Sequence, residues 1–182
     1  MLAASKMFGR IAARAFLRDH WQKRPLLARA ALASPPAFGA RDLIALAGTD
    51  EVESRLVVGN RRRGWRVEYG PFSRARFSRL PASSWTLLVQ DVDKHVPHMA
   101  ELLAPFASFP NWRVDDVMVS HAVPGGSVGP HVDNYDVFLV QLQGKRRWQL
   151  SYQTDHELVA DAELKLLRRF APEEEYVVDA GD

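Results

Sequence analysis

The sequence predicts a mainly β fold that begins with helices and hairpins. Two observations support this fold class. From Trp112 onward, three runs rich in β-branched and aromatic residues follow one another between glycine turns, at residues 112–123, 131–144 and 145–152. Before residue 112, helical and strand-like patterns alternate over short stretches.

Length and composition agree with one globular domain. The 182 residues are 47% hydrophobic and 25% charged, which is ordinary for a folded domain. No cysteine is present, which excludes disulfides, thiolate metal ligands and zinc fingers. No apolar run approaches the roughly 20 residues that span a bilayer. We expect a single domain, 1–182, with helices and hairpins in 1–111 and a β core in 112–182.

The elements of the first part follow from local pattern. A helix is expected at 41–48, ended by Gly48, and a second at 95–109. Strands are expected at 53–60, 64–70 and 84–92, and a turn at 60–64 joins the first two. In the second part, a short helix is expected at 161–169 and a strand that ends in a Gly-Asp turn at 173–182.

The N-terminal stretch 1–21 has no acidic residue before Asp19 and spaces four cations by four residues: Lys6, Arg10, Arg14 and Arg18. That spacing places them on one stripe of an amphipathic helix. An ordinary N-terminal helix is the preferred interpretation, because no cleavage signal is evident. A transit peptide is the alternative. An ordinary helix agrees with a cytoplasmic location, and a transit peptide would indicate the mitochondrion.

Charge is divided unevenly along the chain. Residues 1–154 carry 21 Lys/Arg against 13 Asp/Glu, and residues 155–182 carry 3 against 9. A basic body with the cluster Arg61–Arg63 in a hairpin turn can steer toward nucleic acid or a ribonucleoprotein. A solvated arginine-rich surface is the simpler alternative.

His131 and Asp133 form the candidate metal site. They stand two residues apart, after a glycine-rich turn at 124–130 and before an apolar run. On a strand, residues i and i+2 share one face, so imidazole and carboxylate can converge on one ion. Such a pair supplies two of the three ligands of the facial triad that holds non-heme Fe(II). A hydrogen-bonded structural pair is the alternative.

Arg146 is the candidate anion site. In the run "KRRWQL", Arg146 alternates in phase with Trp148 and Leu150, which indicates an inward side chain. A buried guanidinium needs an anion, and its planar fork suits a carboxylate. A dicarboxylate co-substrate would satisfy it, and an internal salt bridge is the alternative.

Several segments, in this order, resemble the bacterial ribosomal oxygenases of the JmjC/cupin class. The resemblance covers nearly the whole chain and is carried by "FLRDHWQKRPLL", "ESRLV", "GPF", "SWTLLVQDVD" and "NWRVDDVMVSHAVPGGSVGPHVDNYDVFLVQLQGKRRWQL". It implies a double-stranded β-helix, also called a jelly-roll or cupin fold, of JmjC type. It also implies an Fe(II)- and 2-oxoglutarate-dependent hydroxylase that uses O2 and modifies an arginine of a large-subunit ribosomal protein.

The resemblance implies roles for six residues. His131 and Asp133 would ligate iron, and Arg146 would bind the distal carboxylate of 2-oxoglutarate. Ser120 would contact 2-oxoglutarate. Met118 and Tyr135 would flank the target side chain, although packing in the core is an equal alternative for these two.

The sequence departs from the family at its end. The third iron ligand should be a His a few residues past a Gly-Asp turn like Gly181-Asp182, where this sequence stops. His156 is a poor substitute, so we expect a β-helix that is incomplete at its C-terminus, and a chain that is inactive by itself. The alternative function is a non-catalytic cupin fragment that binds a ribosomal or RNA partner. Neither membrane nor direct DNA binding is expected, and the full-length protein could form a homodimer.

Overall fold

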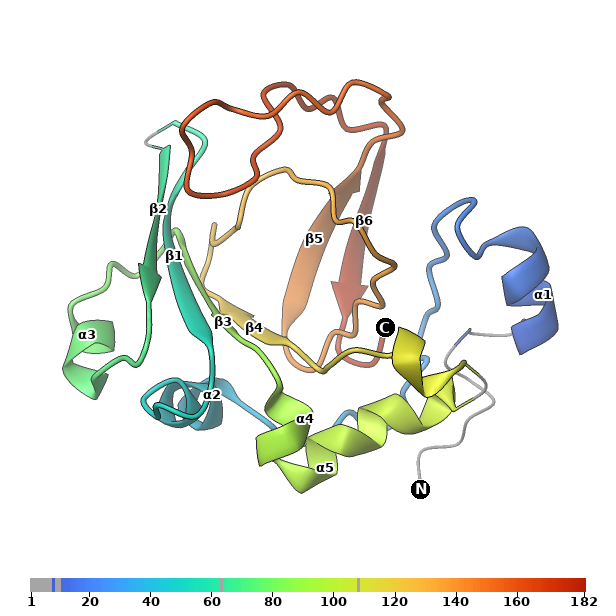
Figure 1. Ribbon diagram of the computed structural model, residues 1–182, viewed down its shortest axis with the longest axis horizontal. Coiled ribbons are helices and arrows are strands. Elements are labelled where there is room, and N and C mark those ends of the chain that lie inside the picture. Colours follow the sequence, from blue (N-terminus) through green and yellow to red (C-terminus); the bar gives the residue numbers. More distant parts are fainter. Residues whose placement is uncertain (1–7, 9–10, 63, 108) are drawn as a thin grey trace.

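The computed structural model describes residues 8, 11–62, 64–107 and 109–182, and it consists of two antiparallel sheets flanked by short helices (Figure 1). The strands are β1 (Ser54–Asn60), β2 (Gly64–Tyr69), β3 (Trp85–Val89), β4 (Val119–Ala122), β5 (Lys145–Leu150) and β6 (Glu174–Asp179). The α-helices are α1 (Ala13–Asp19), α2 (Ala40–Leu46), α3 (Arg74–Ser78), α4 (Val92–His95) and α5 (Pro97–Ala100). Two 3-10 helices follow α5, at Glu101–Phe106 and Asn111–Arg113.

The larger sheet has the order β2-β1-β3-β4. The expected hairpin is present, with β1 and β2 paired antiparallel from Arg55 opposite Tyr69 to Asn60 opposite Gly64. Gly64 has a φ of 75°, which the tight turn requires and which glycine adopts without strain. Because β4 pairs with β3, the sheet joins strands from both 1–111 and 112–182.

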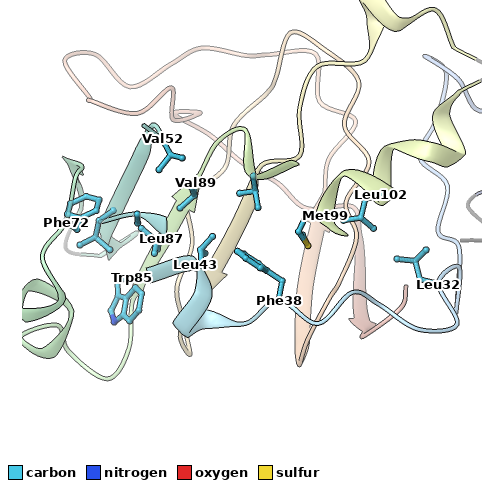
Figure 2. Packing of buried hydrophobic residues seen from close by; sticks show 13 residues of the cluster. Leu32, Phe38, Leu43, Val52, Phe72, Trp85, Leu87, Val89, Met99 and Leu102 are labelled. Carbon is cyan, nitrogen blue, oxygen red and sulfur yellow. The ribbon is translucent and has the colours of Figure 1, made fainter. Parts of the chain in front are cut away.

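The outer face of this sheet carries the main core. Leu56 of β1 and Leu87 and Val89 of β3 pack against the helices that lie below the sheet. Figure 2 shows 13 residues of this cluster, among them Leu43 of α2 and Met99 of α5. Burial of one such side chain contributes about 1.5–3 kcal/mol, so this face dominates the stability of the fold.

The inner face of the same sheet has a much smaller core. Val57, Val67 and Leu88 are buried there, and Trp65, Val128 and Leu164 pack against them. Ser120 shares this face because it stands opposite Leu88 in the ladder between β3 and β4. The inner face therefore has room for polar side chains.

The second sheet pairs β5 with β6. Along β5, Lys145, Arg147 and Gln149 are exposed, whereas Arg146 and Trp148 are half-buried. The alternation is the one that the sequence predicts for this strand. Between the two strands, residues 151–173 form a long loop that arches over the end of the β1–β2 hairpin (Figure 1).

The helix expected at 161–169 is wrong. This stretch is irregular and Asp161 has a φ of 57°, outside the helical region. The Leu167 amide donates to the Pro130 carbonyl at 2.8 Å, and Leu158 forms an isolated bridge with Leu167. These long-range bonds use backbone groups that a helix would pair internally.

Three other expected elements differ from the structure. The run 131–144 is not a strand in the described residues, because only Gln141 exchanges backbone bonds with a neighbouring segment, at Gly181 and Asp182. The run 112–123 forms a ladder only in β4. The helix expected at 95–109 divides into α5 and a 3-10 helix that contains Pro105, which has no amide to donate. Of the N-terminal cations, Lys6 and Arg10 lie outside the described residues.

Asp182 joins the segment that contains Arg29 and Ala30 to the end of β6. Its carboxylate accepts the Ala30 amide at 2.9 Å and the Asp179 amide at 3.0 Å, and it also pairs with Arg29. These backbone hydrogen bonds, followed by the Arg29 charge, lower its pKa from 3.8 to about 2. The side chain is 8% exposed.

We expect Asp182→Ala to lower the free energy of unfolding by about 1–2 kcal/mol at neutral pH, because hydrogen bonds to a charged group are lost. Because the pKa of Asp182 is lower in the folded state than in the unfolded state, this contribution to stability is fully present above pH 3.8. It is lost as the pH falls toward about 2. Urea unfolding at several pH values measures the difference. The control is Asp179→Ala, whose carboxylate pairs with Lys145 on the surface and should change stability by less than about 0.5 kcal/mol. An equal effect of both variants would contradict the role of Asp182.

Candidate functional site

His131 and Asp133 lie on the segment that follows the glycine-rich turn. His131 Nε2 is 3.5 Å from Asp133 Oδ2. Two ligands bound at about 2.1 Å to one ion, at a right angle, lie about 3 Å apart, so the pair fits a shared metal. Both side chains are partly accessible, at 35% and 39% exposure.

A backbone carbonyl orients the His131 ring. His131 Nδ1 lies 2.9 Å from the Gly129 oxygen. Because a carbonyl only accepts hydrogen bonds, Nδ1 carries the proton and Nε2 presents its lone pair. This carbonyl partner is typical of histidines that ligate metals.

The loop 151–173 holds the segment that carries His131. Gly129 has a φ of 79°, and a Cβ at this position would lie 2.3 Å from Leu166 Cδ2 and 3.3 Å from Trp65 Cζ2. Leu166 is only 7% exposed, and its neighbour Leu167 bonds to Pro130. The sequence alone does not predict these contacts, and its only hint of them is the glycine itself.

A hydrogen bond between Arg146 and Ser120 links the two sheets. Arg146 of β5 donates through Nη1 to Ser120 Oγ of β4 at 3.2 Å. The guanidinium lies over the Trp148 ring, 5.0 Å from its centroid. No carboxylate within the described residues forms an ion pair with Arg146. Burial lowers its pKa, but a guanidinium stays charged at neutral pH.

Met118 and Tyr135 are exposed, at 43% and 71%. They do not fill the core, and no hydrogen bond or ring contact in the described residues links them to His131 or Arg146. His156 bonds through Nε2 to the Gln153 carbonyl at 3.1 Å. His121 lies on the outer face, 5.5 Å from the Trp85 ring, and its burial lowers its pKa.

A group of carboxylates that the sequence analysis did not single out lies near α4. Asp91, Asp93 and Asp116 have oxygens within 4.8 Å of one another. Asp116 accepts the Asp91 amide at 2.7 Å, and Asp93 accepts the Val117 amide at 2.7 Å. Burial is the main cause that raises the pKa of Asp116. These hydrogen bonds indicate a structural role for the three carboxylates, because they join α4 to the segment just before β4.

Comparison with known proteins agrees with this architecture. Residues 101–182 match the JmjC domain family. The chain is 44% identical over 141 residues to the "Probable ribosomal oxygenase" of Haemophilus influenzae, covering 77% of this chain and 35% of that protein. It is 43% identical over 136 residues to the "Ribosomal protein uL16 3-hydroxylase" of Escherichia coli, covering 74% and 36%.

The fold is also that of a solved relative. The structure of YcfD, a ribosomal oxygenase from Escherichia coli in complex with cobalt and 2-oxoglutarate, superposes with a TM-score of 0.81 at 36% identity. The match covers 94% of this chain and 44% of that one. The chain thus spans about a third of the curated relatives that it matches and less than half of this solved chain.

The superposition on YcfD and the family match over residues 101–182 show a fold of the JmjC/cupin class, which confirms the expected fold class. Within that class, the chain is plainly similar in sequence to ribosomal oxygenases of bacteria, as its sequence indicated. No helix in the part of the chain that the structure describes is long and apolar enough to cross a membrane.

We expect Gly129→Ala to destabilise the fold by about 1–3 kcal/mol, because the new methyl group meets Leu166 in a packed site. Gly144→Ala is the matched control. Gly144 also has a positive φ, of 66°, but no atom lies within 4 Å of its Cβ position, so this variant reports the backbone strain alone. Urea unfolding compares the two variants. Equal losses would show that Leu166 does not constrain Gly129.

Proposed function

We propose that this chain carries the Fe(II)- and 2-oxoglutarate-binding site of a hydroxylase that modifies a ribosomal protein. The observation that carries the proposal is the approach of His131 Nε2 to Asp133 Oδ2, with Nδ1 tied to the Gly129 carbonyl. The relatives support it, because one is named a hydroxylase of ribosomal protein uL16 and a solved one binds cobalt and 2-oxoglutarate. These names favour an enzyme over a non-catalytic cupin.

His131 and Asp133 would hold the iron as two of its protein ligands. When bound with 2-oxoglutarate and O2, the metal supplies the oxidising chemistry that hydroxylates a C–H bond as 2-oxoglutarate becomes succinate and CO2. The protein orients the His131 ring through Gly129 and places Asp133 Oδ2 3.5 Å from Nε2. The two donors are therefore arranged before the ion arrives, which lowers the cost of binding.

Arg146 and Ser120 would bind 2-oxoglutarate. Arg146 has no carboxylate partner in the part of the chain that the structure describes, so its guanidinium offers a planar fork to the distal carboxylate. The Ser120 hydroxyl, 3.2 Å away, offers a further donor. The Trp148 ring beneath the guanidinium restricts its orientation. Arg146 therefore selects a dianionic co-substrate by charge and by geometry.

Met118 and Tyr135 would contact the target side chain. Both are exposed and available to a partner. A thioether and a phenol suit a long cationic side chain, which agrees with an arginine of a large-subunit ribosomal protein as the target. The two curated relatives named above are bacterial, which supports a bacterial setting over the mitochondrial alternative.

Titration with Co²⁺ tests the metal site. We expect saturable but weak binding of one ion to the 182-residue chain, since two side chains are available as ligands. His131→Ala and Asp133→Ala should each weaken binding by at least about tenfold, because each removes a ligand. His156→Ala is the matched control and should bind as the unaltered chain does. Loss of binding in the His156 variant, or its persistence without His131, would contradict the assignment.

Isothermal calorimetry of the Co²⁺-loaded chain tests the co-substrate site. We expect Arg146→Ala to raise the Kd for 2-oxoglutarate by at least about tenfold, because a charge-assisted pair is worth about 1.5–3 kcal/mol. Co²⁺ binding should be nearly unchanged, and Arg146→Lys should restore part of the affinity. Arg147→Ala is the control, because Arg147 lies on the opposite face and pairs with Glu175 at 3.4 Å. Unchanged affinity in Arg146→Ala would refute the role.

A further inference from the structure

A hollow of about 350 Å³ lies where the β1–β2 hairpin meets the loop between β5 and β6. Figure 1 shows this loop arching over the end of the hairpin. One wall is Arg61, and the remainder comes from the loop: Gln153, Asp155, Arg168, Arg169, Phe170 and Ala171. Neither His131 nor Arg146 lines it, so the hollow is separate from the proposed iron site.

The charges of this hollow are not balanced. Arg168 pairs with Glu157. In the described part of the chain, neither Arg61 nor Arg169 forms an ion pair, and Asp155 is the single carboxylate in the lining. One Asp155 oxygen accepts the Glu157 amide at 3.0 Å. The excess of guanidinium groups favours an anion.

A second hollow, of about 330 Å³, is lined in part by residues at the end of the same hairpin. Its lining includes Arg66, together with Gly59, Gly64 and Ser84. Arg62 is exposed and stands in the turn of this hairpin, next in sequence to Arg61 of the first hollow. Cationic groups therefore continue from one hollow to the next across the hairpin, which suits a chain of anions rather than one small ion.

We propose that this surface, formed by Arg61, Arg62, Arg66, Arg169 and Phe170, binds single-stranded RNA. The arginines contact successive phosphates, and the half-buried Phe170 ring in the first hollow offers an aromatic face on which a base stacks. A volume of about 350 Å³ is at the lower end of small-ligand sites, which fits a single nucleotide.

The inference rests on the proposed function in one respect, which is the choice of RNA. Ribosomal proteins are basic because they bind RNA, so an arginine-rich surface repels the protein component of a ribosomal particle and attracts the RNA component. The RNA surface would then hold the particle while the target side chain enters the separate iron site.

Fluorescence anisotropy with labelled oligouridylate, on the 182-residue chain without metal or 2-oxoglutarate, tests the proposal. Arg61→Ala and Arg169→Ala should each weaken binding by about tenfold and reduce the slope of log affinity against log salt by about 0.7. Phe170→Leu should weaken binding by about tenfold and leave that slope unchanged, because stacking releases no counterion. Asp155→Asn should strengthen binding. Arg41→Ala, which removes an exposed arginine on α2, is the control and should have no effect.

Three results would overturn the proposal: affinity unchanged in Arg61→Ala and Arg169→Ala, an equal loss in Arg41→Ala, or displacement of RNA by polyglutamate at the same charge concentration. The last result would identify an acidic peptide as the ligand. Because the assay contains no metal, it fails or succeeds independently of the Co²⁺ and 2-oxoglutarate measurements. Loss of RNA binding would leave the hydroxylase proposal intact, and the reverse also holds.

Discussion

Burial of β3 on both faces is the constraint on which the rest of the structure depends. All five residues of β3 are buried, and β3 pairs with β1 on one side and β4 on the other. Helices cover its outer face, where Leu87 and Val89 are fully enclosed. Since apolar packing is concentrated there, the inner face can present Ser120 from β4 without loss of the main core.

The candidate site is held by contacts between segments that are distant in the chain. Pro130, next to His131, accepts the Leu167 amide, and Leu166 closes the space beside Gly129. Arg146 reaches Ser120 across the two sheets. A loop that contains no regular helix thus positions the histidine, through buried leucines and backbone hydrogen bonds.

Local sequence was informative where the chemistry depends on spacing alone. The inward phase of Arg146 follows from the two-residue period of a strand. His131 and Asp133 do approach each other, but on an irregular segment and not on the strand from which their approach was expected. The helix expected at 161–169 was wrong. Its leucine spacing is compatible with a helix as well as with the irregular loop that forms, and the tertiary hydrogen bond from Leu167 to Pro130 favours the loop. The strand expected at 131–144 does not form in the described residues, because a strand needs a paired neighbouring strand and its own sequence does not specify one. No local pattern could predict the approach of Asp182 to Ala30, 152 residues away.

The uneven charge of the chain acquires a structural meaning from its ion pairs. Four carboxylates of the acidic segment 155–182 neutralise cations of the body or of the same loop, in the pairs Asp182–Arg29, Asp179–Lys145, Glu175–Arg147 and Glu157–Arg168. None of these pairs includes Arg61, Arg62 or Arg66. The acidic segment therefore compensates cations of β5, Arg29 and part of its own loop, and none of these four ion pairs lies at the end of the β1–β2 hairpin. A potential concentrated at one place on the surface orients an approaching polyanion, whereas the same charges spread evenly would only attract it.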